Sequence, residues 1–464
     1  MKPFHQKKQS GQVFVVFALS LAVLVGVVGL ALDSGLGYLV KAKLNAAADS
    51  AALAGARAVS LGLTRDEQRA AAIAAADKFF AANYPKDYLG SSQVTHATSV
   101  GFDNPQPGSI TVDVAARATI PVMFMGVMGF NLLDISASSQ TIRKDLDMAF
   151  VMDTSGSMAP VTAEVKKQAS AFLDRFSTTT DRISLIHFSN GAEVDVPIKT
   201  GRARGFDRQR MASDINAFHF GGLTNSAEGF WHARDQLNRI AVPDRSTLRV
   251  IVFFSDGTPN TLASYFKLNP ALGCTSSGAI STGDEPVPGL PAGLWDQNRQ
   301  TQPAASPCYQ SNRFSPLLSA SLGAHSLPKW YNAHNPNEQE IPIVTNTPRV
   351  VTNDTSTPAA TWMNINRASK NVVEAMAAKA RAEGIHVFTL GLGPLLQQVT
   401  APDSAPDDTG ENLLKCMANT TDALPRCKAA GAKQPTGVYC HATTAADLQP
   451  CFATLAAEIL RITR

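Results

Sequence analysis

The stretch Asp-Met-Ala-Phe-Val-Met-Asp-Thr-Ser-Gly-Ser-Met, residues 147–158, decides the fold. It begins as an apolar run of strand length and stops at a turn that carries Asp153, Ser155 and Ser157. A loop leaving a buried strand can point several oxygens at one place, and Mg²⁺ and Mn²⁺ prefer oxygen ligands in a near-octahedral shell. Short runs of this kind are also ordinary turn chemistry. Its meaning therefore depends on the segments around it.

Downstream of residue 145, apolar runs of strand length alternate with longer helical patterns, which predicts βαβ units. We expect an α/β fold with a doubly wound, mostly parallel sheet and helices on both faces. The continuously apolar run Ile-Val-Phe-Phe, 251–254, is typical of a strand buried on both faces. The expected strands are 149–152, 183–188, 193–196, 250–254 and 385–390, and the expected helices are 161–176, 208–218, 226–240, 363–383 and 445–462.

Two further segments bring oxygen ligands to the same edge of this sheet. Thr224 follows Gly221-Gly222-Leu223 in a turn before a helix, and Asp256 follows an apolar strand directly. Ligands of open α/β sheets bind at the carboxyl ends of the strands, where such loops meet. The three segments together predict a cation site formed by Asp153, Ser155, Ser157, Thr224 and Asp256.

These segments resemble the metal-ion-dependent adhesion site of von Willebrand factor A-type domains, with its full Asp-x-Ser-x-Ser, Thr and Asp set, over residues 144–464. The resemblance implies direct ligation of Mg²⁺, or of Mn²⁺ or Ca²⁺, by Ser155 and Ser157. It implies that Thr224 binds directly or through water, and that Asp153 and Asp256 hold the shell, often through bridging water.

Neutral hydroxyl ligands leave much of the charge of such a cation uncompensated, so an open coordination position can accept a carboxylate from a protein partner. A site of this kind is a receptor for an acidic residue. The alternative is that the metal only fastens the loops together.

The alternating pattern is lost between residues 261 and 361, a stretch rich in Pro, Ser, Asn and Gly. We interpret it as an irregular insertion that forms a wall beside the cation site and sets partner choice, because loops of this length are usually functional or mobile. All six cysteines lie in the C-terminal half, and their even number at loose spacing favours disulfides in an oxidising compartment. Proximity suggests one pair from Cys274 and Cys308, with the other four, Cys416, Cys427, Cys440 and Cys451, paired among themselves.

The N-terminus carries an uncharged apolar run, residues 13–32, of about the twenty residues needed to cross a bilayer. Lys2, Lys7 and Lys8 precede it and favour a cytoplasmic N-terminus. We expect a single-pass anchor in a bacterial inner membrane, with the bulk of the chain periplasmic or extracellular. A signal peptide cleaved near Gly29-Leu30-Ala31 is the alternative, although the run is longer than a usual signal core.

The region after the anchor is rich in alanine and then changes to a period of two. Thr64 and Glu67 have capping-box spacing for a second helix, and strands are expected at 94–100, 110–116 and 135–141. The Met-rich stretch 121–130 is expected to pack in a core, with contact to a membrane or another protein as the alternative. The expected regions are a tail at 1–12, the anchor at 13–32, Ala-rich helices at 33–85, a small β region at 94–143, and the A-type domain at 144–464 with its insertion at 261–361.

Residues 10–60 resemble the N-terminal region of TadG-like proteins of Flp/Tad pilus assembly. The matching segments are Gly11-Gln12, Leu32-Asp33-Ser34-Gly35, Tyr38-Leu39 and the alanine-rich 45–56. The resemblance implies pilus-assembly components as partners. Pilin-like relatives cleaved by a prepilin peptidase carry Glu five residues after the glycine, but this chain has Val16 there, so we expect the anchor to be kept.

Several function classes are disfavoured. A net charge of +3 without clustered Lys and Arg gives no reason to expect a nucleic acid. The segment 154–158 does not fit Gly-x-Ser-x-Gly, and no P-loop motif is present. His187, His219, His232 and His386 lack ligand spacing and are interpreted as packing or surface residues, and the acidic run 403–411 as a solvated loop. We predict a non-enzymatic, metal-dependent protein-binding component of pilus assembly or surface attachment, with a non-adhesive scaffold as the alternative.

Overall fold

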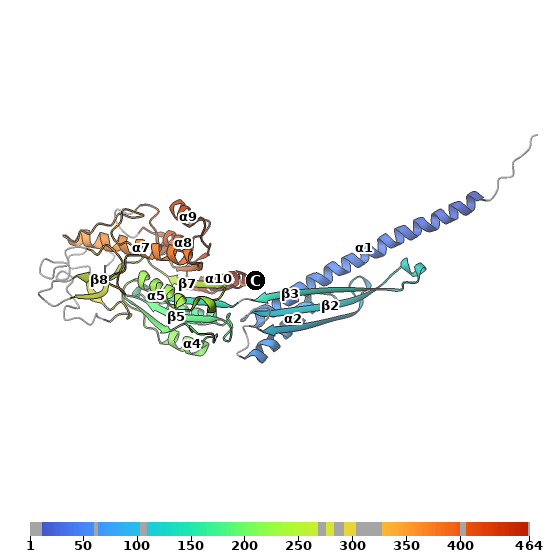
Figure 1. The fold of residues 1–464 in the computed structure, drawn as a ribbon, viewed down its shortest axis with the longest axis horizontal. Helices are drawn as coiled ribbons and strands as arrows, with labels where there is room; N and C mark the ends of the chain where they lie inside the picture. The colour runs from blue at the N-terminus through green and yellow to red at the C-terminus, as the bar shows by residue number, and fades with distance from the viewer. Residues whose placement is uncertain are drawn as a thin grey trace, which may run out of the picture. The chain divides into compact units, whose positions relative to one another are not determined.

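The chain forms two compact units, Met1–Arg143 and Lys144–Arg464. The computed structural model describes residues 12–59, 64–102, 109–143, 145–267, 275–282, 292–302, 327–399 and 405–462. Figure 1 shows the elements of each unit.

The N-terminal unit is built on one continuous helix of 47 residues, α1 (Gln12–Ala58). The expected anchor and the start of the Ala-rich region form a single helix, because only isolated glycines interrupt the good helix formers. Within the described part of the chain, α1 is the one helix long and apolar enough to cross a membrane. Its beginning is exposed, whereas small and apolar side chains spaced three or four apart are buried further along, namely Val40, Leu44, Ala47, Ala48, Ala51 and Ala52.

A second helix and a three-stranded antiparallel sheet pack on the later part of α1. Helix α2 (Arg65–Asn83) begins with the predicted capping box, in which Glu67 N donates to Thr64 Oγ1 and Thr64 N donates to Glu67 Oε2, both over 3.3 Å. The sheet order is β1 (Ser92–Phe102), β2 (Ile110–Pro121) and β3 (Leu132–Arg143). The period-two pattern therefore located these strands correctly.

The Met-rich stretch lies at the tip of the β2–β3 hairpin, so the expectation that it packs in a core is wrong. Pro121 pairs with Leu132, and the segment between them only reverses the chain, partly as the 3₁₀ turn η3 (Met125–Met128). Met123 is 77% exposed and Phe130 is 56% exposed. Among the described residues, no other element covers the outer side of this turn, so its apolar composition does not reflect burial in a core.

The C-terminal unit contains a six-stranded sheet with the order β12-β11-β7-β4-β5-β6. All neighbouring strands are parallel except β5 and β6. All five predicted strands are present. The strands are β4 (Leu146–Asp153), β5 (Arg182–Phe188), β6 (Ala192–Val196), β7 (Leu248–Ser255), β11 (Ile385–Leu392) and the unpredicted β12 (Tyr439–Ala442).

Helices cover both faces of this sheet, as predicted. Along β4, Met148 and Phe150 belong to one apolar core and Ala149 and Val151 to the other, because successive side chains of a strand point to opposite faces. The first core includes side chains of α3 (Thr162–Leu173), α4 (Arg208–Ala217) and α10 (Leu448–Ile462), and the second those of α5 (Ser226–Asn238), α7 (Pro358–Ala382) and the unpredicted α8 (Gly410–Ala418).

The insertion is more regular than the sequence suggested. Strands β8 (Thr261–Lys267), β9 (Thr275–Ser281) and β10 (Ala292–Trp295) form a separate three-stranded antiparallel sheet. Ser, Gly and Ala make up most of β9, and Gly and Ala are depleted in strands, so the pattern gave no prediction there.

Two disulfides fasten the C-terminal part of this unit. Cys416 in α8 pairs with Cys427 in α9 (Pro425–Gly431), and Cys440 in β12 pairs with Cys451 in α10. The four late cysteines therefore pair among themselves, as predicted from proximity. Cys274 and Cys308 lie outside the described residues.

Candidate metal centre

Three loops meet at the carboxyl edge of the parallel strands. The first leaves β4 after Asp153, the second precedes α5, and the third leaves β7 after Ser255. Backbone hydrogen bonds tie them together: Gly221 N donates to Thr154 O over 2.9 Å, and Asn260 N donates to Thr224 O over 3.0 Å. The loops therefore hold one another in place through their main chains.

Gly222 is the position in these loops where only glycine fits. Its φ of +84° lies in the left-handed region, and an added Cβ would lie 2.3 Å from the Ser189 hydroxyl. The glycine-rich turn is thus needed so that the segment carrying Thr224 can approach the end of β5.

Four of the five predicted ligands form one hydrogen-bonded chain. Ser155 N donates to Asp153 Oδ1 over 2.8 Å. The hydroxyls of Ser155 and Ser157 are 3.1 Å apart, and that of Ser157 donates to Asp256 Oδ1 over 2.9 Å. Thr224 lies at the same edge, with its Oγ1 3.8 Å from the place where a Cβ on Gly257 would be. The structure thus brings all five residues to one place, with Thr224 joined mainly through its backbone.

The two carboxylates are buried side by side. Asp153 has no exposed surface, and burial raises its pKa to about 6. Burial and, to a smaller extent, the neighbouring charge of Asp153 together raise the pKa of Asp256 to about 8. Within the described residues, neither carboxylate forms an ion pair with Lys, Arg or His. A bound divalent cation would offset both the burial and the repulsion.

The donor set fits a hard divalent cation. It consists of carboxylate and hydroxyl oxygens only, which suits Mg²⁺, Mn²⁺ or Ca²⁺ rather than a thiolate- or imidazole-seeking metal.

Sequence reasoning missed the residues that support these ligands. Ser255 donates to Asp153 Oδ2 over 2.6 Å, Asn260 Oδ1 accepts from Thr224 N over 2.8 Å, and Asn190 Oδ1 accepts from Leu223 N over 2.7 Å. Each follows or ends a strand, so its position at the sheet edge was visible, but the sequence gave no sign of its partner.

The insertion reaches the edge of the site through Gln300. The side-chain amide of Gln300 donates to Thr154 Oγ1 over 2.9 Å, and the backbone carbonyl of Gln300 accepts from Gly191 N over 3.1 Å. The segment 292–302 therefore lies next to the loop that carries Asp153 and Ser155. The cysteine-containing part of the expected wall lies outside the described residues.

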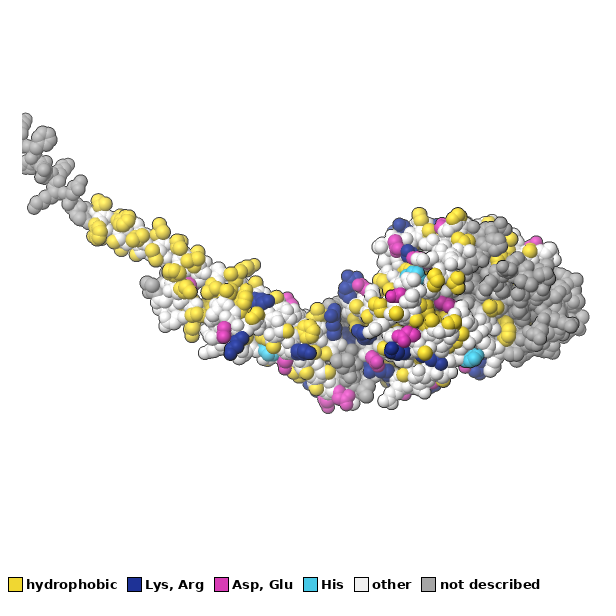
Figure 2. All heavy atoms as spheres, turned by 180° about the vertical axis from the view of Figure 1, so that it is seen from behind, with side chains coloured by type: hydrophobic (Ala, Val, Ile, Leu, Met, Phe, Trp, Pro, Cys, Tyr) yellow, Lys and Arg dark blue, Asp and Glu magenta, His cyan; other side chains and the backbone are white. Residues whose placement is uncertain are grey.

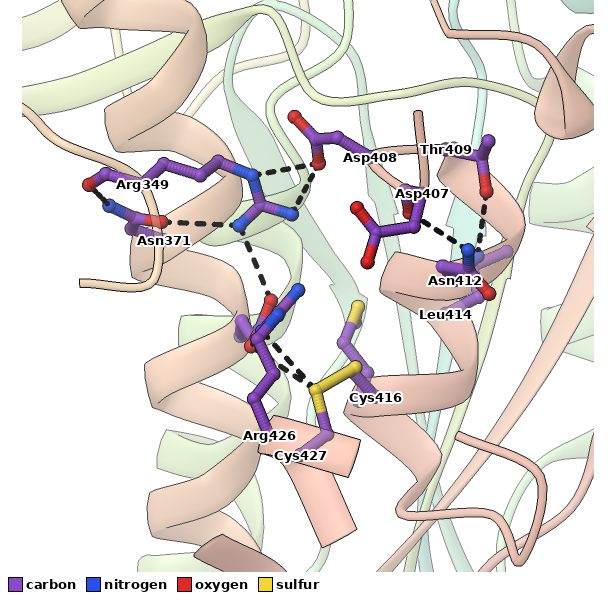
Figure 3. The surroundings of a disulfide bond; sticks show 12 residues. Arg349, Asn371, Asp407, Asp408, Thr409, Asn412, Leu414, Cys416, Arg426 and Cys427 are labelled. Atoms are coloured by element: carbon purple, nitrogen blue, oxygen red, sulfur yellow. Dashed lines mark hydrogen bonds and ion pairs between the residues drawn. A yellow bond between two sulfur atoms is a disulfide. The ribbon is translucent and has the colours of Figure 1, made fainter. Parts of the chain in front are cut away.

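The described part of the acidic run, residues 405–411, is not simply a solvated loop, and Asp403 lies outside the described residues. Asp408 is 8% exposed, and its carboxylate contacts Arg349 Nη2 over 2.6 Å and Lys370 Nζ over 3.2 Å. Figure 3 shows Arg349 pointing to Asp408 and Asn371 beside the Cys416–Cys427 disulfide. The positive charges of Arg349 and Lys370 hold the pKa of Asp408 below its usual value. These three side chains therefore form a structural ion cluster rather than a Ca²⁺ site.

Comparison with known families agrees with this architecture. Residues 148–258 match the model of the von Willebrand factor type A domain. The C-terminal unit contains an A domain. Residues 11–58 match the putative Flp pilus-assembly TadE/G-like family. The chain thus combines a TadE/G-like N-terminal region with an A domain, as the motifs predicted. No curated protein matches the chain.

Solved structures resemble the chain only at a low level. The pilus adhesin SpaC from Lactobacillus rhamnosus GG, in its open conformation, is 14% identical with a TM-score of 0.40, and the match covers 80% of this chain and 34% of that chain. The PilB minor pilin from Streptococcus sanguinis is 13% identical, with a TM-score of 0.37 and coverage of 80% and 78%. The vWF domain of the type V pili tip protein Mfa5 from Porphyromonas gingivalis is 15% identical, with a TM-score of 0.36 and coverage of 70% and 98%. We base no function on matches at this level.

Proposed function

We propose that this chain is a membrane-anchored, adhesion-type component of a Tad-like pilus system, whose A domain captures a protein partner through a divalent cation. Residues 13–32 of α1 serve as a single-pass anchor in the inner membrane, with the N-terminus cytoplasmic and the A domain outside. The partner supplies an acidic residue to the cation. No catalytic step is assigned to the chain.

One observation carries this proposal: the buried carboxylates of Asp153 and Asp256 share a cluster with the hydroxyls of Ser155 and Ser157 and have no cationic partner in the described chain. Mg²⁺ would be held by the two serines and Thr224, with the aspartates fixing the shell. The ligands lie on loops already joined by backbone hydrogen bonds, so little ordering is needed when the ion binds. The TadE/G-like match of residues 11–58 supports the pilus setting.

Calorimetry of the full-length protein in detergent tests the site. We expect Mg²⁺ or Mn²⁺ to bind to wild type, with loss of binding in Ser155→Ala and Asp256→Ala. Ser184→Ala is the matched control, because Ser184 is a buried serine in β5 of the same domain and is not one of the predicted ligands. Equal binding by wild type and by Ser155→Ala would refute the site.

Crosslinking in intact cells tests the function. Under the proposal, wild type captures a partner in a Mg²⁺-dependent manner and Asp153→Ala does not, although both fold. Capture that survives both chelation and Asp153→Ala would instead support the alternative, a scaffold in which the metal only stabilises loops.

A further inference from the structure

A second cluster of metal-ligating side chains lies in the A domain, away from the oxygen ligands at the ends of β4 and β7. Glu228 and His232 stand four residues apart on α5, on the same face of the helix. His334 comes from the end of the insertion, more than a hundred residues later. One ligand atom of each residue lies within 4.8 Å of the ligand atoms of the other two.

Two of the three ligands are buried, and one ring nitrogen of the cluster is unsatisfied. Glu228 has no exposed surface and His232 is 9% exposed. His232 Nε2 is buried and has no hydrogen-bond partner among the described residues. A buried polar atom without a partner is rare in folded proteins and calls for a ligand or an ion. A hydrogen-bonded network of protein groups alone therefore leaves this nitrogen unexplained.

The other two ligands are held in place by their neighbours. His334 Nε2 lies 2.7 Å from Glu228 Oε2, and the hydroxyl of Tyr331 donates to Glu228 Oε1. The ring of His334 stacks on Trp231, with the ring centroids 3.5 Å apart. Ligands whose orientation is fixed by a second layer of contacts are a general property of metal sites.

We propose that Glu228, His232 and His334 bind a Zn²⁺-like cation. Two imidazole nitrogens and one carboxylate are a common ligand set for zinc, which takes four ligands in a tetrahedron. A water would supply the fourth ligand. The site would join the C-terminal end of the insertion to α5, the helix that follows Thr224. It is independent of the proposed Mg²⁺ site, since it shares no ligand with it and prefers a softer ion.

The test uses full-length protein freed of metal by chelation and titrated with Co²⁺, whose visible absorption reports four-coordinate binding, and then with Zn²⁺. We expect one equivalent of Co²⁺ to bind, Zn²⁺ to displace it, and His232→Ala and His334→Gln to lose the absorption. Asp256→Ala serves as the control and keeps it.

Three results would overturn the proposal: wild type that binds no Co²⁺ or Zn²⁺, binding that His232→Ala leaves unchanged, or absorption that Asp256→Ala abolishes. The first of these results is measured on wild type, so the proposal can be refuted even if a variant does not fold. Failure of Mg²⁺ binding would refute the proposed function but leave this site untouched.

A different observation in the N-terminal unit concerns the exposed hairpin tip. The carboxylate of Asp33 accepts hydrogen bonds from the backbone N–H groups of Met123, Phe124 and Met125 over 3.1, 2.9 and 2.8 Å. Asp33 is the first charged residue after the apolar run 13–32, which spans about 30 Å as a helix, the thickness of the hydrocarbon layer. Asp33 therefore fixes the tip at the depth where the run ends.

The tip also extends one turn back along the apolar run. An added Cβ on Gly29 would lie 2.3 Å from Phe124 Cβ, so the glycine lets the tip contact the helix closely. Residues 121–133 carry no charge, and Met123, Phe130 and Leu132 are all more than half exposed. Figure 2 shows hydrophobic side chains along the exposed length of α1.

The geometry points to insertion of this tip into the outer leaflet of the membrane that α1 spans, an inference that rests on the proposed anchor. The bilayer is the partner that we expect to cover the tip, because the exposed apolar surface of the tip adjoins the lipid-facing surface of α1. Exposed apolar residues beside a helix end would be buried in the boundary between headgroups and acyl chains.

Brominated lipids provide the test. Full-length Phe124→Trp in liposomes is expected to show more quenching by lipids brominated near the headgroup than wild type, whose four tryptophans form the background. Phe79→Trp is the control, because Phe79 is exposed on α2, a helix that packs against Gly55, far beyond Asp33 along α1. If the protein floats with the liposomes but residue 124 shows no extra quenching, the insertion of the tip is refuted and the anchor is not. Protein that does not float would refute the anchor and the tip together.

Discussion

The A domain contains two buried polar clusters that differ in how they are assembled. The oxygen cluster of Asp153, Ser155 and Asp256 is built on loops that directly follow parallel strands. The cluster of Glu228, His232 and His334 joins a helix to the end of the insertion. The first has only oxygen donors and the second has two imidazoles, so they suit different ions. Under the two proposals, one sheet scaffold offers a hard-ion and a softer-ion site without shared ligands.

The largest expected effect is the loss of Mg²⁺ binding in Asp256→Ala. Removing a buried carboxylate from this cluster should weaken Mg²⁺ binding about 100-fold or more, which corresponds to about 3 kcal/mol. Calorimetry measures the change, and Co²⁺ absorption of the same variant should stay unchanged. A parallel loss of both ions would show that the two clusters are one coupled site.

The reverse experiment uses His232→Ala. Zn²⁺ binding should fall by at least about tenfold, because one of three protein ligands is removed, while Mg²⁺ affinity remains within about twofold. Competition with a chromogenic chelator gives the Zn²⁺ affinity. Unchanged Zn²⁺ affinity would leave Glu228 and His334 as a hydrogen-bonded pair only.

The third prediction concerns pH. In metal-free protein the pKa of Asp256 is raised to about 8 by burial, so the folded state holds a proton that the unfolded state releases near pH 4. Unfolding free energy should therefore fall as pH rises from about 4 to 8, and by about 1–2 kcal/mol more in wild type than in Asp256→Asn.

Saturating Mg²⁺ should flatten this dependence, because the ion favours the ionised carboxylate. Urea denaturation at several pH values, with and without Mg²⁺, measures the slope. An equal slope in wild type and Asp256→Asn would show that this carboxylate is not the group responsible.

The smallest effect is expected for Gln300→Ala. The variant loses the hydrogen bond to Thr154 at the edge of the oxygen cluster, which should lower stability by about 1 kcal/mol. Mg²⁺ affinity should change less than about twofold, since Gln300 contacts no proposed ligand in the described structure. A larger change in Mg²⁺ affinity would mean that the insertion shapes the ion's shell directly.

The sequence predicted those features that depend on local pattern. The apolar runs located β4, β5, β6, β7 and β11, and the capping box at Thr64 located the start of α2. Both features depend on residues that are close together in the sequence. The proposed oxygen ligands Asp153 and Asp256 lie at one edge for the same reason, because Asp153 ends β4, Asp256 follows β7, and the two strands are parallel neighbours.

The remaining features depend on contacts between distant segments. Nothing near His232 in the sequence indicated His334, and nothing near Thr154 indicated Gln300. The apolar composition of residues 121–130 predicted a core, but their exposure follows from where the hairpin ends beside Asp33. In β9 of the insertion, Ser, Gly and Ala outnumber the β-branched residues that usually mark a strand.

The most direct test of the central claim is the position of Mn²⁺ in a crystal of the A domain, located by anomalous scattering. The account predicts a peak about 2.0–2.3 Å from the hydroxyl oxygens of Ser155 and Ser157, next to Asp153 and Asp256. A fully occupied Mn²⁺ bound elsewhere, with these hydroxyls still hydrogen-bonded to each other and to Asp256, would contradict it.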